Sequence, residues 1–368
     1  MKIAIIFLAL VFTVQISAQD VRFINNDGVN SIGTQENRTA SITLYDIDKD
    51  GDLDALVANG RHWAEQNYIY FNNGKGRFLN AMPVGKFMDS SYRMVAGDLN
   101  GDGFADIAVA NDRAPNRIYW GSKDGDFKSE TSFGDPDAPS RNLTVGDLDK
   151  DGDLDLIISN RASQNEICLN DGKGNFGKTV KFGDSDDQTI EIEIVDINKD
   201  GFLDLVTAER QAKNKIYLND RDQGLDAAIE FGNEKDETRS IEIADFDKDG
   251  FLDILAGNLG TKNVIYFGDK ELLFKREFTF PEARMTASVA VADLDQDGFL
   301  DIVEGNSEAA NYVHLGKADG SFREISLGEN EKLDTYNMTI GDLNNDGLPD
   351  IAESNSGSLN LYYLTRKR

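Results

Sequence analysis

Residues 245–253 read Asp-Phe-Asp-Lys-Asp-Gly-Phe-Leu-Asp, with acidic residues at positions 1, 3, 5 and 9 and glycine at position 6. The pattern Asp-x-Asp/Asn-x-Asp-Gly-x-x-Asp occurs seven times, starting at Asp46, Asp98, Asp147, Asp196, Asp245, Asp293 and Asp342. Successive copies begin 48–52 residues apart. A period this regular indicates one structural unit repeated along the chain.

The segments around each nonapeptide predict β-strands. Ile241 and Ile243 alternate with other residues before the fifth copy, and residues 154–159 form a short apolar run after the third. A third segment begins at asparagine, as at 116–119, and a glycine-rich turn such as 170–174 leads into a fourth. No segment has a sustained helical period. Four antiparallel strands per repeat predict an all-β fold, a seven-bladed β-propeller over residues 19–368.

The two ends of the chain predict how the ring closes. The last repeat stops after its third strand, at residues 360–364, and residues 21–23 resemble the fourth strands of other repeats. We therefore expect the N-terminal strand to complete the seventh blade. The alternative is an open solenoid, which leaves an exposed strand edge at each end.

The N-terminal residues predict export. Lys2, the apolar stretch 3–14 and the small residues Ser17-Ala18 are typical of a signal peptide over residues 1–18. The apolar stretch is too short for a membrane anchor, so no membrane insertion is expected. Because the repeats continue to the end of the sequence, we expect the periplasm rather than the extracellular space. Cys168 is the only cysteine, so a metal rather than a disulfide is expected to stabilise the protein.

The nonapeptides are suited to calcium. Oxygen ligands at positions 1, 3, 5 and 9 with glycine at the sharp turn match the first part of an EF-hand loop, although no glutamate follows at position 12. A single copy could be a polar turn, whereas seven copies in register predict up to seven structural Ca²⁺ ions. The predicted ligands are Asp46, Asp48, Asp50 and Asp54; Asp98, Asn100, Asp102 and Asp106; Asp147, Asp149, Asp151 and Asp155; Asp196, Asn198, Asp200 and Asp204; Asp245, Asp247, Asp249 and Asp253; Asp293, Asp295, Asp297 and Asp301; and Asp342, Asn344, Asp346 and Asp350.

These ligands explain the acidity of the chain, whose formal net charge is −28. Of the 66 acidic residues, 25 are ligand positions, which leaves 41 against 38 lysines and arginines. The remainder is nearly neutral, so the charge implies no basic partner, and no nucleic acid is expected to bind.

Nine arginines lie at the end of the repeats opposite the nonapeptides. They are Arg38, Arg93, Arg141, Arg239 and Arg284 before or within the inner strands, and Arg61, Arg113, Arg161 and Arg210 after the second strands. A partial ring of guanidinium groups suits an anionic ligand such as a carboxylate or sulfate, here an anionic oligosaccharide. The alternative is pairing with acids of the same loops, such as Asp89, Asp112 and Asp187. The predicted substrate-binding residues are Arg38, Arg61, Trp63, Arg93, Arg141 and Arg239.

The candidate catalytic residues are His62, Tyr92 and Tyr336. Tyr92 and Tyr336 stand at matching positions, six residues before the first ligand of their loops, and His62 lies in the second turn of the first repeat. Histidine and tyrosine can transfer protons, and Trp63 can stack on a sugar. The alternative is ordinary packing of aromatic side chains in loops. We also expect His314 in the core, Glu193 and Glu242 facing the axis, and Glu304 and Glu353 in an ion-pair network.

The repeats resemble those of FG-GAP (VCBS-type) proteins, the calcium-binding propellers of integrin α-subunits and many exported bacterial proteins. Phe-Gly pairs stand at residues 133–134, 182–183 and 231–232, while the Gly-Ala-Pro part is missing and Phe280-Pro281 departs from the pattern. The resemblance implies the fold and calcium. In length, signal and repeats the chain is also similar to the oligosaccharide dehydratases of ulvan-degrading marine bacteria.

That second similarity implies a lyase that performs β-elimination on uronic-acid-containing oligosaccharides, although no catalytic motif aligns residue by residue. The alternative is a non-catalytic glycan- or protein-binding module, as in integrins.

Overall fold

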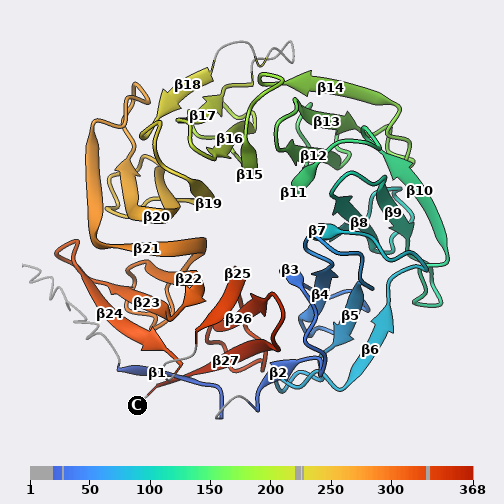
Figure 1. Ribbon diagram of the computed structural model, residues 1–368, viewed down its shortest axis with the longest axis horizontal. Helices are drawn as coiled ribbons and strands as arrows, with labels where there is room; N and C mark the ends of the chain where they lie inside the picture. The colour runs from blue at the N-terminus through green and yellow to red at the C-terminus, as the bar shows by residue number, and fades with distance from the viewer. Residues whose placement is uncertain (1–19, 27–28, 220–224, 226–227, 329–331, 368) are drawn as a thin grey trace, which may run out of the picture.

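The computed structural model describes residues 20–26, 29–219, 225, 228–328 and 332–367. The predicted signal peptide, residues 1–18, lies outside the described residues. Within them the secondary structure consists of strands and turns without helices, so no helix that could cross a membrane is found there. The sheets are arranged around a central axis, with β3, β7, β11 and β15 innermost (Figure 1).

Each of the first four repeats forms one four-stranded antiparallel sheet. The strands are β3 (Thr39–Tyr45), β4 (Asp54–Asn59), β5 (Tyr68–Phe71) and β6 (Asn80–Pro83); β7 (Ser91–Gly97), β8 (Asp106–Asn111), β9 (Asn116–Trp120) and β10 (Ser129–Phe133); β11 (Ser140–Gly146), β12 (Asp155–Asn160), β13 (Asn165–Leu169) and β14 (Lys178–Phe182); and β15 (Thr189–Val195), β16 (Asp204–Glu209), β17 (Asn214–Tyr217) and β18 (Ala228–Phe231). This architecture is the expected all-β fold of antiparallel blades.

The remaining strands are hydrogen-bonded into one sheet of eleven. They are β19 (Thr238–Ala244), β20 (Asp253–Phe267), β21 (Arg276–Ala292), β22 (Asp301–Ala309), β23 (Asn311–Gly316), β24 (Phe322–Leu327), β25 (Leu333–Gly341), β26 (Asp350–Asn355), β27 (Asn360–Lys367), β1 (Val21–Ile24) and β2 (Ser31–Ile32). Strand β1 pairs antiparallel with β27, from Val21 opposite Lys367 to Ile24 opposite Leu364.

The joined sheet differs from the separate blades expected for the last three repeats. Strand β21 pairs with β20 through its first half and with β22 through its second half, so it runs from one repeat into the next. Elsewhere a glycine with positive φ follows the fourth strand, as Gly134 (66°) and Gly183 (74°) do. Phe280-Pro281 lacks this glycine, and the strand continues.

The core lies between neighbouring sheets. All six residues of β4, β8, β12, β16 and β26 are buried, which explains the apolar runs after the nonapeptides. One cluster, for example, joins Ile157 and Ile167 to Ile192 and Leu205 of the following repeat. Burial of this apolar area stabilises the fold by about 25 cal/mol per Å².

Buried polar side chains also link one repeat to the next. Thr39 Oγ1 donates to Asn59 Oδ1 (2.7 Å), and Asn67 Nδ2 donates to Ser91 Oγ of the second repeat (2.8 Å). The pattern recurs along the chain, and Asn360 Nδ2 of the last repeat donates to Thr39 Oγ1 of the first (3.1 Å). Because buried polar groups need partners, this network fixes how neighbouring sheets meet.

Candidate functional site

The nonapeptide loops connect the first and second strands of each repeat, and four loops gather three carboxylates within 4.8 Å of one another. The groups are Asp46, Asp48 and Asp50; Asp147, Asp149 and Asp155; Asp245, Asp247 and Asp253; and Asp293, Asp295 and Asp297. These four loops have aspartate rather than asparagine at position 3. Such clusters could bind a hard cation.

Two features of these loops fit a cation. Asp46 Oδ1 and Asp147 Oδ1, at position 1, are buried and have no hydrogen-bond partner within the described chain. Burial, followed by the charge of Asp50, raises the pKa of Asp48, and burial followed by Asp297 raises that of Asp295 to about 6. Without a positive ion these carboxylates repel one another, so the residues present fit calcium.

The aspartate at position 9 also ties the loop to the blade. Asp54 accepts hydrogen bonds from the backbone N–H groups of Ile47 (3.2 Å) and Asn72 (2.9 Å). The equivalent aspartate makes both bonds in the other six repeats. Position 9 therefore links the nonapeptide to the end of the third strand as well as offering an oxygen.

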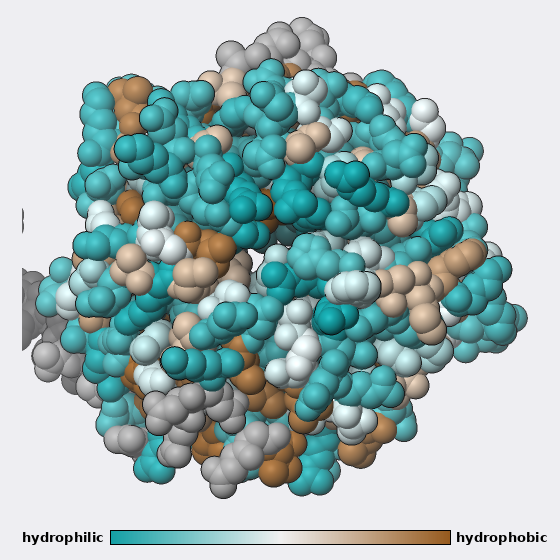
Figure 2. Space-filling model, viewed as in Figure 1, coloured by the Kyte–Doolittle hydropathy of each residue, from teal (hydrophilic) through white to brown (hydrophobic). Residues whose placement is uncertain are grey.

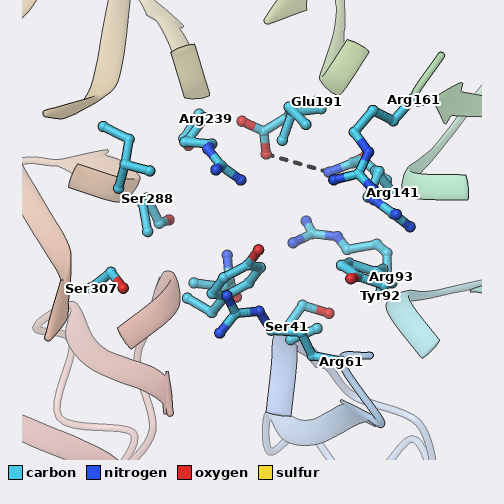
Figure 3. Close-up of a pocket in the computed structure, with 18 of the residues that line it drawn as sticks. Ser41, Arg61, Tyr92, Arg93, Arg141, Arg161, Glu191, Arg239, Ser288 and Ser307 are labelled. Carbon is cyan, nitrogen blue, oxygen red and sulfur yellow. Dashed lines mark hydrogen bonds between the residues drawn. The ribbon is translucent and has the colours of Figure 1, made fainter. Parts of the chain in front are cut away.

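A cavity on the central axis is lined by three structurally repeated positions. Two are the residues that follow the Thr or Ser at the start of each inner strand, and one is the residue after the second strand. The lining residues are Ala40, Ser41, Arg61, His62, Tyr92, Arg93, Arg141, Asn142, Arg161, Ile190, Glu191, Arg210, Arg239, Ser240, Leu259, Ala287, Ser288, Ser307, Tyr336 and Asn337 (Figure 3). The face that surrounds the central opening is largely hydrophilic (Figure 2).

A β-bulge directs these side chains to the axis. The register of every first pair of strands shifts at this point, as between Ser91 and Arg93 and between Thr335 and Asn337. A bulge inserts an extra residue and re-aims the side chains beside it. Consequently Tyr92 and Arg93, two successive residues, both line the cavity.

Five of the predicted residues form one constellation across the first, second, third and last repeats. Tyr92 Oη lies 3.1 Å from His62 Nδ1, and the guanidinium of Arg61 lies 3.9 Å from the ring centre of Tyr336. The guanidinium of Arg141 lies 4.4 Å from the ring centre of Tyr92. The structure thus brings together all three candidate catalytic side chains and two candidate binding arginines.

The pKa shifts in this constellation keep both proton-transfer groups neutral near pH 7. Burial, followed by the charges of Arg61 and Arg141, lowers the pKa of His62 below its usual 6.5. Burial raises the pKa of Tyr92 to about 12 although Arg141 opposes the shift. A neutral imidazole can accept a proton, and a neutral phenol can donate one.

The positive φ of His62 (67°) is a property of its turn. The corresponding turns of other repeats also contain a residue with positive φ, among them Arg113 (54°), Ala162 (60°) and Gln211 (57°). The strained backbone is therefore common to the repeats and is no sign of catalysis by itself.

The cavity arginines differ in their ion pairs. Arg61 pairs with Asp334 (2.6 Å), Arg141 with Asp112 (2.9 Å), and Arg210 with Glu237 (3.2 Å). Arg239 shares Glu237 with Arg210. The alternative, pairing of the cavity arginines with acids of the same loops, therefore holds for Asp112. Asp89 instead pairs with Arg117 and Asp187 with Lys215, two basic residues of third strands.

These ion pairs leave donors unused. The Nε atoms of Arg61, Arg93, Arg141 and Arg239 are buried without a hydrogen-bond partner among the described residues. Among the residues that the structure describes, neither Arg93 nor Arg161 forms an ion pair. The cavity can therefore bind an anion.

Three glutamates lie deeper in the channel. Glu191, Glu193 and Glu242 line a second cavity. Arg93 and Glu191 line both this cavity and the first one. Burial raises the pKa of Glu193 to about 8 and, together with the other two carboxylates, that of Glu242 well above its usual value. As expected, Glu193 and Glu242 face the axis, and they are largely protonated there.

Two predicted binding residues lie outside the cavity. Trp63 is 62% exposed, and the Arg38 guanidinium lies 5.2 Å from the centre of its ring. The reason is the long turn of the first repeat, with seven residues between Asn59 and Asn67 against four between Asn111 and Asn116. The longer turn places Trp63 beyond the lining residues. Neither Trp63 nor Arg38 lines the cavity, and their role in substrate binding stays a prediction.

His314 is buried, as expected, and Nε2 lies 2.7 Å from Glu304 Oε2. Arg284 lies 3.2 Å from the same carboxylate, so Arg284 and Glu304 form an ion pair away from the cavity. Glu353 is buried as well and accepts from Asn311 Nδ2 (2.9 Å).

Sequence reasoning did not assign Arg161, Arg210 and Glu191 to the binding site. The signal was available for the two arginines, because each directly follows a second strand, close to the place that Arg61 takes one residue further along its turn. Glu191 follows the bulge in the same way as Arg93.

Comparison with known proteins identifies the repeats. The FG-GAP-like repeat family matches six overlapping segments: residues 46–109, 98–158, 147–207, 196–256, 245–304 and 298–352. No curated protein sequence matches the chain significantly. The chain thus belongs to the family of FG-GAP-like repeat proteins.

Solved structures agree with this fold. Two crystal structures of BBS1N in complex with ARL6DN, soaked with mercury and with lead, each contain a chain that superimposes with a TM-score of 0.63. The identities are 12% and 11%, and the alignments cover 95% and 93% of this chain and 98% and 96% of the others. Similarity at this level of identity concerns the fold alone.

Proposed function

We propose that the protein is an exported, calcium-stabilised propeller of seven blades, closed by β1, and that it catalyses β-elimination on uronic-acid-containing oligosaccharides. The observation that carries the enzymatic part is the cavity in which a tyrosine–histidine pair, Tyr92 and His62, stands beside unpaired arginine donors. Calcium is inferred from the seven nonapeptide loops, four of which gather three carboxylates each.

β-Elimination from a uronate needs three groups. The carboxylate is neutralised, a base removes the C5 proton, and an acid protonates the C4 oxygen as it leaves. Arg93 has a free Nε–H and lies next to Tyr92 in the chain, so it supplies the neutralising charge. The C5 carbanion is then stabilised as an enolate, which collapses to the C4–C5 double bond.

The Tyr92–His62 hydrogen bond can return the proton. His62 Nε2 accepts the C5 proton, and Tyr92 Oη donates its proton to the C4 oxygen. The Nδ1 proton of the imidazolium then passes to Tyr92 over 3.1 Å, which restores both neutral groups. Tyr336, held against Arg61, is the second acid that can reach the leaving group.

The test is formation of the unsaturated product, followed by ultraviolet absorbance of the C4–C5 double bond. His62→Ala, Tyr92→Phe and Tyr336→Phe are compared with Tyr68→Phe, a tyrosine of β5 outside the cavity. At least one of the three should lower turnover by about 10²-fold, the usual range for general acid–base catalysis. A variant lacking all three side chains that turns over at the parent rate excludes this site.

Calcium has its own test. If each ion is present at about 100 times its dissociation constant, it adds about 2.7 kcal/mol to the free energy of unfolding. Chelation should therefore lower the melting temperature, and Asp50→Asn should reduce the effect in part. The loop at residues 245–253 is the matched comparison. There Arg276 pairs with Asp247 and Asp249, so part of the negative charge is already offset. An unchanged melting curve in excess chelator rules out structural calcium.

Trp63 favours a second candidate, a non-catalytic glycan-binding module. Its exposed ring, stacked on Arg38, is the kind of surface on which a sugar packs without any chemistry. If the parent protein binds oligosaccharides, loses that binding in Trp63→Ala and forms no unsaturated product, the binding function is the better one.

A further inference from the structure

We propose that Arg161, with Arg141 and Arg210, forms a second anion subsite in the axial cavity, so that the ligand carries two oxyanion groups rather than one. The inference rests on the proposed function for the first subsite, where Arg93 and the Tyr92–His62 pair bind a uronate. The second subsite lies in the third and fourth repeats, beside that constellation (Figure 3).

The charges of this part of the cavity do not balance. Arg141 has Asp112 as its partner, whereas Arg210 and Arg239 share the single carboxylate of Glu237. Arg161 forms neither an ion pair nor a side-chain hydrogen bond in the described chain. The acidic groups near these arginines are the two paired carboxylates, Asp112 and Glu237, and Glu191. The guanidinium groups are four: those of Arg141, Arg161, Arg210 and Arg239.

Glu191 does not fill the gap. Its carboxylate accepts from the backbone N–H of Ile241 (2.8 Å) and from Asn142 Nδ2 (3.4 Å), and the charge that acts on it is that of Arg93. Burial raises the pKa of Glu191, so its negative charge is reduced as well. Asp112, the ion-pair partner of Arg141, also acts on Arg161, but Arg161 has no ion pair of its own among the described residues.

The surroundings of Arg161 disfavour its positive charge. Burial, followed by the positive charge of Arg141, lowers the pKa of the Arg161 guanidinium, and Arg210 acts in the same direction. Three cations at one wall repel one another. Charge-assisted hydrogen bonds to a planar or tetrahedral oxyanion would use these donors and remove the repulsion.

The opposite wall leaves room for the rest of the ligand. Ala287, Ser288 and Ser307 of the sixth repeat each occupy a position that holds arginine or tyrosine in the second repeat, in the third, or in both. Hydroxyl groups and small side chains suit the uncharged face of a sugar. The second charged group is either another uronate carboxylate or a sulfate ester, since both present oxygens that arginine binds.

The experiment measures equilibrium binding by calorimetry on the calcium-loaded protein. The probes are glucuronate, a diuronate disaccharide, and a uronate disaccharide with and without a sulfate ester. We expect the parent to bind at least one dianion about tenfold or more tightly than the monoanions. Arg161→Gln should abolish that preference and change glucuronate affinity less than twofold. The dianion that loses more affinity identifies the second group.

Two variants serve as controls. Arg161→Lys keeps the charge and should retain most of the preference. Arg113→Gln removes an exposed arginine from the equivalent turn of the second repeat, outside the cavity, and should change nothing. The inference is overturned if the parent does not prefer dianions, or if Arg161→Gln weakens monoanions and dianions equally.

Binding and turnover separate the two proposals. A protein that prefers dianions through Arg161 but forms no unsaturated product has the second subsite without the lyase activity. A protein that forms product and yet binds dianions independently of Arg161 has the activity without the subsite.

Discussion

Glu209 stands where the other six repeats have asparagine, namely Asn59, Asn111, Asn160, Asn258, Asn306 and Asn355. In those repeats the amide oxygen accepts from a Thr or Ser hydroxyl, and Nδ2 donates to a backbone carbonyl, as Asn160 does to Gln164 (2.9 Å). Glu209 Oε1 accepts from Thr189 (3.0 Å), while the buried Oε2 has no hydrogen-bond partner among the described residues. A carboxyl group can donate a hydrogen bond, as the amide Nδ2 does, only when it is protonated.

This residue predicts a pH-dependent stability. Burial raises the pKa of Glu209 to about 7, with Asp187 adding to the shift and Lys215 opposing it. Between the usual pKa near 4.5 and about 7 the folded state holds a proton that the unfolded state has released. The stability from this group is therefore complete below pH 4.5 and is lost as the pH rises through 7.

Glu209→Asn should remove that loss. Because one pKa unit corresponds to about 1.4 kcal/mol, the variant should gain on the order of 3 kcal/mol over the parent between pH 4.5 and pH 8. Urea unfolding across this range, in saturating calcium, measures the difference. Parallel pH profiles for parent and variant would mean that Glu209 has no raised pKa.

The residues that could be predicted from sequence are those set by the repeat. Spacing identified the acidic loops, and counting back from their first aspartate aligned Tyr92 with Tyr336. Spacing could not reveal that position 9 bonds two backbone amides, because those amides come from the second residue of the loop and from the third strand. It also could not separate paired from unpaired arginines, since Asp334 and Glu237 come from neighbouring repeats.

At the scale of the strand and its turn, the Phe-Gly pair has a steric reason. A Cβ added to Gly85 would lie 2.2 Å from Tyr119 Cε1, on the third strand of the next repeat. A Cβ on Gly183 or Gly328 would lie 3.3 Å from the hydroxyl oxygen of Tyr217 or Tyr363, which is a tight contact rather than an overlap. Each glycine therefore leaves space for the tyrosine of the following sheet.

That contact predicts the result of a matched pair of substitutions. Gly85 and Gly125 have similar positive φ angles, 64° and 69°, but a Cβ at Gly125 would meet nothing within 4 Å. Gly125→Ala should cost about 1 kcal/mol for the backbone alone. Gly85→Ala should cost about 1–3 kcal/mol more, because Tyr119 is buried and cannot move away. Equal losses on urea unfolding would remove this explanation of the motif.

The exception to the motif follows the same logic. Phe280-Pro281 replaces the usual pair, and the ring of His314, which replaces tyrosine, lies 5.1 Å from that of Phe280. The sequence showed both departures separately. That they form one contact, and that β21 runs through it, depends on side chains from different strands and could not be predicted.

At the scale of the whole molecule, hydrogen bonds link the nonapeptide loops of neighbouring repeats. Lys49 Nζ donates to the carbonyl of Gly103 in the next loop (2.5 Å), and Gln296 Nε2 donates to that of Gly347 (2.7 Å). Asn345 of the last loop donates to Asp52 of the first (2.5 Å). The contact between last and first repeats is therefore of the same kind as those between successive repeats.

Closure in solution can be tested by comparing one such contact with its equivalent inside the chain. Asn360 Nδ2 reaches Thr39 Oγ1 over 3.1 Å, across the junction of the last and first repeats, and Asn116 Nδ2 reaches Ser140 Oγ over 3.2 Å between successive repeats. Double-mutant cycles, with Asn→Ala at 360 and 116, Thr39→Val and Ser140→Ala, isolate the coupling energy of each pair. A closed ring predicts about 0.5–1.5 kcal/mol for both, the net value of a buried hydrogen bond. In an open arrangement the Asn360–Thr39 coupling falls to zero while the Asn116–Ser140 coupling persists, because only the first pair depends on the two ends of the chain meeting.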